Sequence, residues 1–193
     1  MDKKIVLASA SPRRKEILSN LGLLFEVITS DAEEKTDAEL PPYMIVQELA
    51  MLKGTDVARR AGDAVVISAD TIVWLDGMVL GKPSDEANAK KMLKKLSGKT
   101  HEVYTGVCVT DSKNGKSVSD YEVTKVRFRE LDEDEIDRYI STGEPMDKAG
   151  AYGIQGKGCL FVEAIEGDYL NVVGLPAVKL SKILKEEFNF NLI

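Results

Sequence analysis

The chain has 193 residues, of which 44% are hydrophobic and 30% charged, a balance that excludes fibrous and low-complexity proteins. Its formal net charge is -6 and its sequence pI is about 5.0. Without a global positive field we expect no stable binding of nucleic acid, so an anionic ligand must be held by local groups.

The first half of the chain alternates predicted strands and helices. In chain order we expect a strand at 4–8, a helix at 12–21, a strand at 24–29, a helix at about 43–60 and short strands at 64–68, 72–75 and 78–80. Pro12 at the first helical position and Gly22 after the last are typical helix boundaries. Asp76-Gly77 is a strong signal for a two-residue hairpin turn.

The second half contains the clearest helix signals. In chain order we expect a helix at 84–96, strands at 101–110 and 117–129, a helix at 132–140, strands at 158–165 and 169–173, and a helix at 176–188. Asp132 and Glu135 resemble a capping box. Because hairpins are inserted between helices, we predict an α/β fold with a mixed central sheet flanked by helices, as one domain of residues 1–193 with two lobes.

The chain carries no signal for export or membrane insertion. Its two cysteines, Cys108 and Cys159, lack CxxC spacing, which argues against a disulfide framework and a thiolate zinc site. The apolar run near the N-terminus is too short for a signal peptide, and no stretch approaches the roughly 20 apolar residues of a membrane helix. We therefore expect a cytoplasmic protein.

The segment from Ser9 to Lys15 is the first candidate for chemistry. It places hydroxyls and three cations where a strand ends and a helix begins. The free N–H groups and the dipole of a helix start attract anions, and cations in a first turn are unfavourable without one. Phosphate binding is the interpretation we favour, although Ser-Pro is also an ordinary helix start and exposed arginines are common.

Other nucleotide and hydrolase motifs are missing. The GxxxxGK[ST], GxGxxG and GxSxG patterns do not occur, which argues against a P-loop NTPase, a Rossmann dehydrogenase and a serine hydrolase. The single histidine, His101, lies in a predicted strand. A core or strand-capping role is therefore more plausible for it than membership of a catalytic triad.

Two acidic groups could hold a metal ion. Glu33-Glu34-Lys35 lies in an acidic loop, and Asp70 follows the strand predicted at 64–68. Oxygen-only ligands suit Mg²⁺ or Mn²⁺, which bind through one or two carboxylates and phosphate oxygens. Adjacent loop acids are often only solvated surface, but an acid at the end of an apolar strand lies where α/β sheets place their sites. Asp70 could ligate the metal or act as general base.

Three lysines lie in constrained or mostly apolar settings and could neutralise a triphosphate. They are Lys53, Lys82 and Lys148. Lysine is a point cation, and neighbouring glycines let the backbone approach a phosphate. For each lysine taken alone, a solvated surface charge is the simpler explanation.

Together these motifs resemble the Maf family, and the match is colinear over essentially the whole chain. The matching segments include Leu7-Ala8-Ser9-Ala10-Ser11-Pro12-Arg13-Arg14, Glu33-Glu34-Lys35, Ser68-Ala69-Asp70-Thr71, Gly81-Lys82-Pro83 and the run from Asp147 to Gly156. The resemblance implies a Maf/ITPase-like fold with a deep cleft between two lobes, often as a homodimer. It also implies cleavage of a nucleoside triphosphate to the monophosphate and pyrophosphate.

The resemblance assigns roles residue by residue. The phosphate-binding residues it implies are Ser9, Arg13, Arg14, Lys53 and Lys82. Glu33 and Asp70 would hold a divalent cation, Mg²⁺ or Mn²⁺, and Asp70 would be catalytic. A family branch similar to dTTP/UTP pyrophosphatases carries Arg, Thr and Gln where the 7-methyl-GTP branch carries Trp, Gln and Glu.

The three positions that separate these branches are Arg13, Thr71 and Gln155. All match the pyrimidine branch, so the resemblance implies hydrolysis of dTTP and UTP by metal-assisted attack of water on the α-phosphate. Modified pyrimidine nucleotides are further candidate substrates. A glutamine amide offers both a donor and an acceptor to uracil or thymine. Two alternatives remain at this point: a nucleotide-binding regulator of cell division and septum formation without turnover, and a nucleotidyltransferase.

Overall fold

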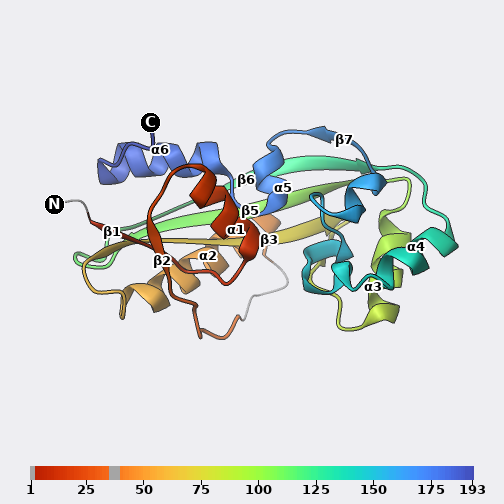
Figure 1. The fold of residues 1–193 in the computed structure, drawn as a ribbon, viewed down its shortest axis with the longest axis horizontal. Coiled ribbons are helices and arrows are strands. Elements are labelled where there is room, and N and C mark those ends of the chain that lie inside the picture. The colour runs from red at the N-terminus through yellow and green to blue at the C-terminus, as the bar shows by residue number, and fades with distance from the viewer. Residues whose placement is uncertain (1–2, 35–39) are drawn as a thin grey trace. The chain divides into compact units, whose positions relative to one another are not determined.

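A computed structural model describes residues 3–34 and 40–193 of the chain, and this part forms a seven-stranded mixed sheet (Figure 1). The strands are β1 Lys4–Leu7, β2 Phe25–Val27, β3 Ala64–Leu75, β4 Met78–Leu80, β5 Thr100–Asp111, β6 Ser117–Phe128 and β7 Val162–Glu166. Their order is β2-β1-β3-β5-β6-β7, with β4 paired to β3. β1 runs parallel to β2 and β3, whereas β4 and β7 are antiparallel to β3 and β6. The predicted mixed α/β class is confirmed.

Helices flank the sheet. They are α1 Pro12–Asn20, α2 Pro42–Ala58, α3 Glu86–Leu96, α4 Glu133–Ile140, α5 Tyr169–Val173 and α6 Ala177–Phe188, with 3-10 helices η1 Glu144–Asp147, η2 Ala149–Ala151 and η3 Lys157–Phe161. Among the described residues, no helix is both long and apolar enough to cross a membrane. The predicted capping at Asp132 is confirmed, because its carboxylate accepts a hydrogen bond from the Glu135 N–H at 2.7 Å.

The chain divides into two compact units. Unit 1 contains the described residues of Met1–Asp70, Thr105–Glu122 and Gly174–Ile193, and unit 2 contains Thr71–Tyr104 and Val123–Val173. In the view of Figure 1, α2 lies below the strands of unit 1 and α6 lies above them. In unit 2, α3 contacts α4, η1 and η2.

Close approach of α2 to two strands shapes unit 1. A Cβ added at Gly106 of β5 would lie 2.2 Å from the carbonyl oxygen of Val46, so the helix backbone rests directly on that strand. A Cβ added at Gly54 of α2 would lie 2.6 Å from Oγ of Ser68 on β3. Glycine at both positions removes the side chain that would hold helix and strand apart. Lys53, the neighbour of Gly54, is thereby brought beside β3.

Three strand predictions are corrected by the structure. β3 is one continuous strand from Ala64 to Leu75, so Asp70 lies inside a strand and not after its end. Residues 169–173 form α5 and not a strand, because the Asp168 carboxylate accepts a hydrogen bond from the Leu170 N–H at 2.8 Å and starts a helical turn. Similarly, the strand expected at 158–165 begins only at Val162, after η3.

An aromatic cluster forms part of the core of unit 2. Phe128 packs edge-on against His101, Tyr152 and Phe161, with ring centroids 5.0, 4.7 and 5.9 Å apart. His101 is only 2% exposed, and its Nε2 lies 2.8 Å from the Tyr152 hydroxyl. The expected core role of this histidine is confirmed. Its burial lowers the pKa of the imidazole from 6.5 to about 4.

This low pKa predicts acid sensitivity. Between pH 6.5 and about 4 the unfolded chain binds a proton at His101 that the folded chain does not, so stability falls as the pH falls through this window. At about 1.4 kcal/mol per pKa unit the loss is roughly 3 kcal/mol. We expect the difference in unfolding free energy between the wild type and His101→Gln to change by this amount across urea titrations from pH 7 to 4. A constant difference would contradict the assignment.

Candidate active site

A lysine held by two carboxylates lies at the centre of the candidate site. Nζ of Lys53, on α2, is 2.6 Å from Oδ1 of Asp70, on β3, and 2.9 Å from Oε1 of Glu34. The side chains of Lys53 and Asp70 are 14% and 12% exposed. Burying a lone carboxylate inside a strand is costly, and the ammonium group offsets that cost.

The turn between β1 and α1 presents arginines and backbone donors. Nε of Arg14 donates to the carbonyl oxygen of Gly174 at 2.7 Å, and its NH1 donates to Oγ of Ser9 at 3.2 Å. The same Ser9 oxygen accepts a hydrogen bond from the Ser11 N–H at 3.2 Å. Within the described residues, the Ser11 side chain makes no capping hydrogen bond at the start of α1. The N-terminal end of the α1 helix dipole therefore lies beside these groups, where it favours an anion.

Electrostatics joins the turn to the lysine and its carboxylates. Burial lowers the pKa of the Arg14 guanidinium, and the positive charge of Arg13 lowers it further. The negative charges of Asp70 and Glu34 act in the opposite direction and partly offset this shift. An arginine stays charged despite such a shift. We call this group the unit 1 cluster, which comprises Ser9, Arg13, Arg14, Glu34, Lys53 and Asp70. It combines cations with carboxylates in one unit.

The carboxylates of the unit 1 cluster fit a divalent cation. Asp70 and Glu34 already direct oxygen atoms at one positive charge, the Lys53 ammonium. Mg²⁺ and Mn²⁺ need only one or two carboxylates when phosphate oxygens and water complete the shell. In residues 3–34 and 40–193, no group of three or more His, Cys, Asp or Glu side chains is arranged to hold a metal alone.

The structure draws attention to Glu34, which the sequence reasoning placed in a candidate metal-binding group but gave no individual role. Glu34 pairs with Lys53, whereas the part expected of its neighbour Glu33 as a metal ligand stays a prediction. No local pattern distinguishes two adjacent glutamates of one loop. Lys35, the third residue of the predicted motif, lies outside the described residues.

The remaining predicted site residues belong to unit 2. Thr71 follows Asp70 along β3, Lys82 is exposed beside Gly81, and Gln155 is exposed between η2 and η3. Of the lysines considered from sequence, Lys148 has a structural contact, because its Nζ donates to the carbonyl oxygen of Glu144 at 2.7 Å. The binding roles of Thr71, Lys82 and Gln155 stay predictions.

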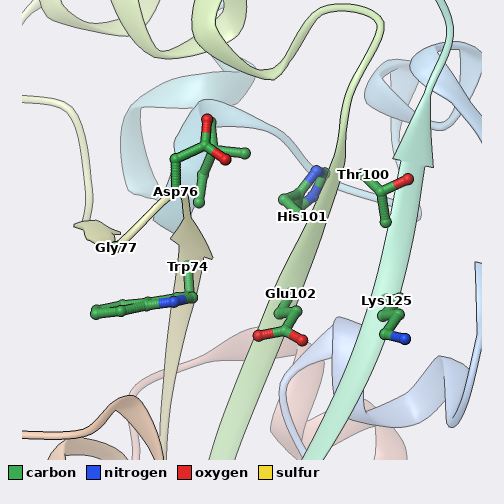
Figure 2. A pocket seen from close by; sticks show the side chains of 8 residues that line it. Trp74, Asp76, Gly77, Thr100, His101, Glu102 and Lys125 are labelled. Carbon is green, nitrogen blue, oxygen red and sulfur yellow. The ribbon is translucent and has the colours of Figure 1, made fainter.

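A pocket of about 260 Å³ also opens on unit 2 (Figure 2). Its lining residues are Trp74, Leu75, Asp76, Gly77, Thr100, His101, Glu102 and Lys125. Asp76 is paired with Lys99 at 2.8 Å, and Nδ1 of His101 finds no hydrogen-bond partner among the described residues. With one lysine and two acids in its lining, this pocket lacks the excess positive charge that a triphosphate requires.

Comparisons with known proteins identify a family and similar proteins for this chain. The family described as Maf-like protein matches residues 4–187. A dTTP/UTP pyrophosphatase of Alkaliphilus oremlandii (strain OhILAs) is 55% identical over 192 residues, which cover 99% of this chain and 100% of that protein. A dTTP/UTP pyrophosphatase of Bacillus cereus (strain ATCC 10987 / NRS 248) is 54% identical over 189 residues, 98% of this chain and 92% of that protein.

Among solved structures, a HAM1 protein from Coxiella burnetii has a similar fold. The TM-score is 0.56 at 17% sequence identity, over 96% of this chain and 100% of that one. At this identity the likeness concerns the fold alone.

The Lys53 contacts predict how the protein responds to metal. Lys53→Met leaves the Asp70 and Glu34 carboxylates without their shared cation, which we expect to cost about 3 kcal/mol of stability at neutral pH. The same change leaves both carboxylates available to Mg²⁺. Added Mg²⁺ should therefore raise the thermal unfolding midpoint of the variant more than that of the wild type, by about 2–4 °C for each kcal/mol of stabilisation that its binding supplies. A double variant that also carries Asp70→Asn is the control, and it should lose the extra response. Equal shifts in wild type and single variant would refute a carboxylate pair open to metal.

Proposed function

We propose that this chain, which belongs to the Maf family, hydrolyses dTTP and UTP to the monophosphate and pyrophosphate. The observation that carries the proposal is the unit 1 cluster, where Asp70 and Glu34 share the Lys53 ammonium within electrostatic reach of Arg14. The names of relatives that are 55% and 54% identical support the nucleotide class. A nucleoside triphosphate pyrophosphatase needs positive charge to bind the phosphates and a carboxylate to accept a proton from the attacking water. The unit 1 cluster contains both kinds of group.

The cations of the cluster would bind the phosphates. Arg13 and Arg14 supply donors for phosphate oxygens, and arginine recognises them in a bidentate way that lysine does not. Arg14 is held in place by the Ser9 hydroxyl and the Gly174 carbonyl oxygen, so little side-chain entropy remains to be lost on binding. Lys53 would add a point charge, as would Lys82 of unit 2 in the role that the resemblance implies, and the N-terminal end of α1 would add its helix dipole.

Asp70 would act as the general base. Its carboxylate accepts a proton from the attacking water, whose oxygen bonds to the α-phosphorus while the bond to the bridging oxygen breaks and pyrophosphate leaves. The Lys53 ammonium keeps this carboxylate in one orientation on β3. A positioned general base contributes typically 10²- to 10⁴-fold to the rate.

The carboxylates would also hold a metal ion. Asp70 and Glu34, with Glu33 as the ligand expected from the family resemblance, are the residues that would bind Mg²⁺ or Mn²⁺. When bound, such an ion would stabilise the negative charge that develops on the phosphate oxygens.

Three side chains would select the base. Arg13, Thr71 and Gln155 are the residues we assign to this role, as the resemblance implies. Gln155 is exposed and carries one amide that can donate to and accept from the edge of uracil or thymine. A guanine edge, with its adjacent donors, would suit a carboxylate at this position instead.

Replacing the base tests the chemistry. Asp70→Asn removes the proton acceptor and keeps the shape, so we expect pyrophosphate release from UTP to fall by about 10²- to 10⁴-fold. The matched control is Asp111→Asn, since Asp111 is also a buried acid of unit 1 paired with a lysine, Lys3, and it should keep wild-type turnover. Rates are measured in water without any acceptor alcohol, and the circular dichroism spectra of all variants are compared.

Three outcomes of that assay would count against the proposal. Wild-type rates in Asp70→Asn would exclude this residue as the base. A wild-type protein that binds UTP and releases no pyrophosphate would be a regulator without turnover, and release only with an added acceptor would indicate a nucleotidyltransferase.

The choice of base is tested by Gln155→Glu. The carboxylate has no donor for the pyrimidine carbonyl groups, and one lost hydrogen bond leaves a partner unpaired, so we expect kcat/KM for UTP to fall about tenfold or more. The chain's other glutamine provides the control, because Gln47→Glu makes the same charge change on α2 of unit 1. If Gln155→Glu left the ranking of UTP, CTP and GTP unchanged, this residue would have no part in base selection.

A further inference from the structure

The segment around Gln155 is built on one carboxylate, that of Glu144 at the start of η1. Oε1 of Glu144 accepts hydrogen bonds from the Tyr139 hydroxyl at 2.9 Å and from the Gly158 N–H at 3.1 Å. Oε2 accepts one from the Lys157 N–H at 2.9 Å. A side chain thirteen positions away thus holds two successive backbone donors at the start of η3.

The glycines of this segment let the chain pass directly over that carboxylate. A Cβ added at Gly156 would lie 2.4 Å from Oε1 of Glu144, and one at Gly158 would lie 2.7 Å from the carbonyl oxygen of Gly153. Neither contact is possible for a real side chain. Gly156 is therefore explained by close packing against Glu144, and Gly158 by close packing against the backbone of Gly153.

Backbone on both sides of Gln155 is tied to the same two side chains. The Tyr139 hydroxyl, which donates to Glu144, also accepts a hydrogen bond from the Gly153 N–H at 3.1 Å. On the other side, Lys157 and Gly158 donate to Glu144. Gln155 is exposed between these fixed points, so its backbone has little freedom while its amide faces solvent.

The charge state of Glu144 suits this task. Burial alone would raise the pKa of its carboxyl, but the hydrogen bonds from the Lys157 N–H, the Gly158 N–H and the Tyr139 hydroxyl, with the charge of Lys148, outweigh burial and lower the pKa. The group is therefore ionised at neutral pH, and both oxygens present only lone pairs to the donors around them.

We propose that Glu144 is a positioning residue for nucleotide selection, which fixes the backbone around Gln155 so that the amide of Gln155 meets the pyrimidine edge in one orientation. The inference rests on the proposed function and goes beyond it, because it assigns base selection partly to a residue that need not touch the nucleotide. Selection then depends on the carboxylate of Glu144 and, to a smaller extent, on the hydroxyl of Tyr139.

The closest isostere removes the anchor with little change in shape. In Glu144→Gln, one carboxylate oxygen becomes an NH₂ group, which must face a backbone N–H or the Tyr139 hydroxyl and cannot accept from it. We expect kcat/KM for UTP to fall about tenfold through KM, with kcat within about twofold, because the phosphates and the base Asp70 are unaffected. Tyr139→Phe, which keeps Glu144 but loses the link to Gly153, should shift selectivity in the same direction by less.

A double-mutant cycle with Gln155→Ala separates positioning from general stability. If Glu144 acts through Gln155, adding Glu144→Gln to Gln155→Ala should change kcat/KM for UTP by less than about twofold, and the ratio of UTP to GTP turnover should already be lost in either single variant. A purely structural role predicts the opposite. The loss would then be the same for UTP and GTP, would persist in the Gln155→Ala background, and would overturn the inference.

A second measurement keeps this inference separate from the proposed function. Hydrogen exchange of the Gly153, Lys157 and Gly158 amides should accelerate in Glu144→Gln, and unchanged exchange would overturn the anchor. If the wild type released no pyrophosphate, hydrolysis would fail as a function, while titration with a nonhydrolysable UTP analogue would still decide about Glu144. Positioning is supported if Glu144→Gln binds the analogue more weakly than the wild type, while the double variant binds it as well as Gln155→Ala alone. Equal binding by wild type and Glu144→Gln refutes it.

Discussion

The buried charge of Asp70 is the constraint on which the candidate site depends. An acid in the interior of a strand must be neutralised, and Lys53 does so from α2 at 2.6 Å. That contact requires α2 to lie very close to β3. At position 54 a Cβ atom would clash with Oγ of Ser68, and glycine avoids this clash. A single glycine in a helix therefore sets the distance between the Asp70 carboxylate and its counter-ion.

The elements predicted correctly from the sequence are those whose signals are local. Helix α4 begins where Asp132 caps it, as predicted from the residues beside it, and α3 is also predicted, although its N-cap is Asp85 and its predicted start is residue 84. The elements predicted wrongly depend on distant partners. The polar pair Asp70-Thr71 interrupts the apolar pattern of β3, and only Lys53, which belongs to another element, makes a continuous strand acceptable there.

For α5 the local contact at Asp168 is joined by a distant one. Val172 and Val173 favour a strand, but the side chain of Asn171 is fully buried and donates to the carbonyl oxygen of Val103 at 2.9 Å. That contact joins positions 68 apart, and no pattern within the segment could reveal it. The candidate site follows the same rule, since the family resemblance could name Lys53 and Asp70 but no sequence pattern could pair Lys53 with Glu34 in preference to Glu33.

The two units hold the carboxylates to which we assign roles by different kinds of partner. In unit 1, Asp70 and Glu34 are held by the Lys53 side chain, a point charge on a long stem with rotatable bonds. In unit 2, Glu144 is held mainly by backbone N–H groups of η3, which cannot leave without opening the turn. Hydrolysis requires charged groups that can give up one ionic partner for another as the substrate binds and reacts. Discrimination between bases requires a hydrogen-bond donor and an acceptor that stay in place. The adaptable ion pair is therefore suited to the phosphates, and the rigid glycine-rich turn is suited to the base.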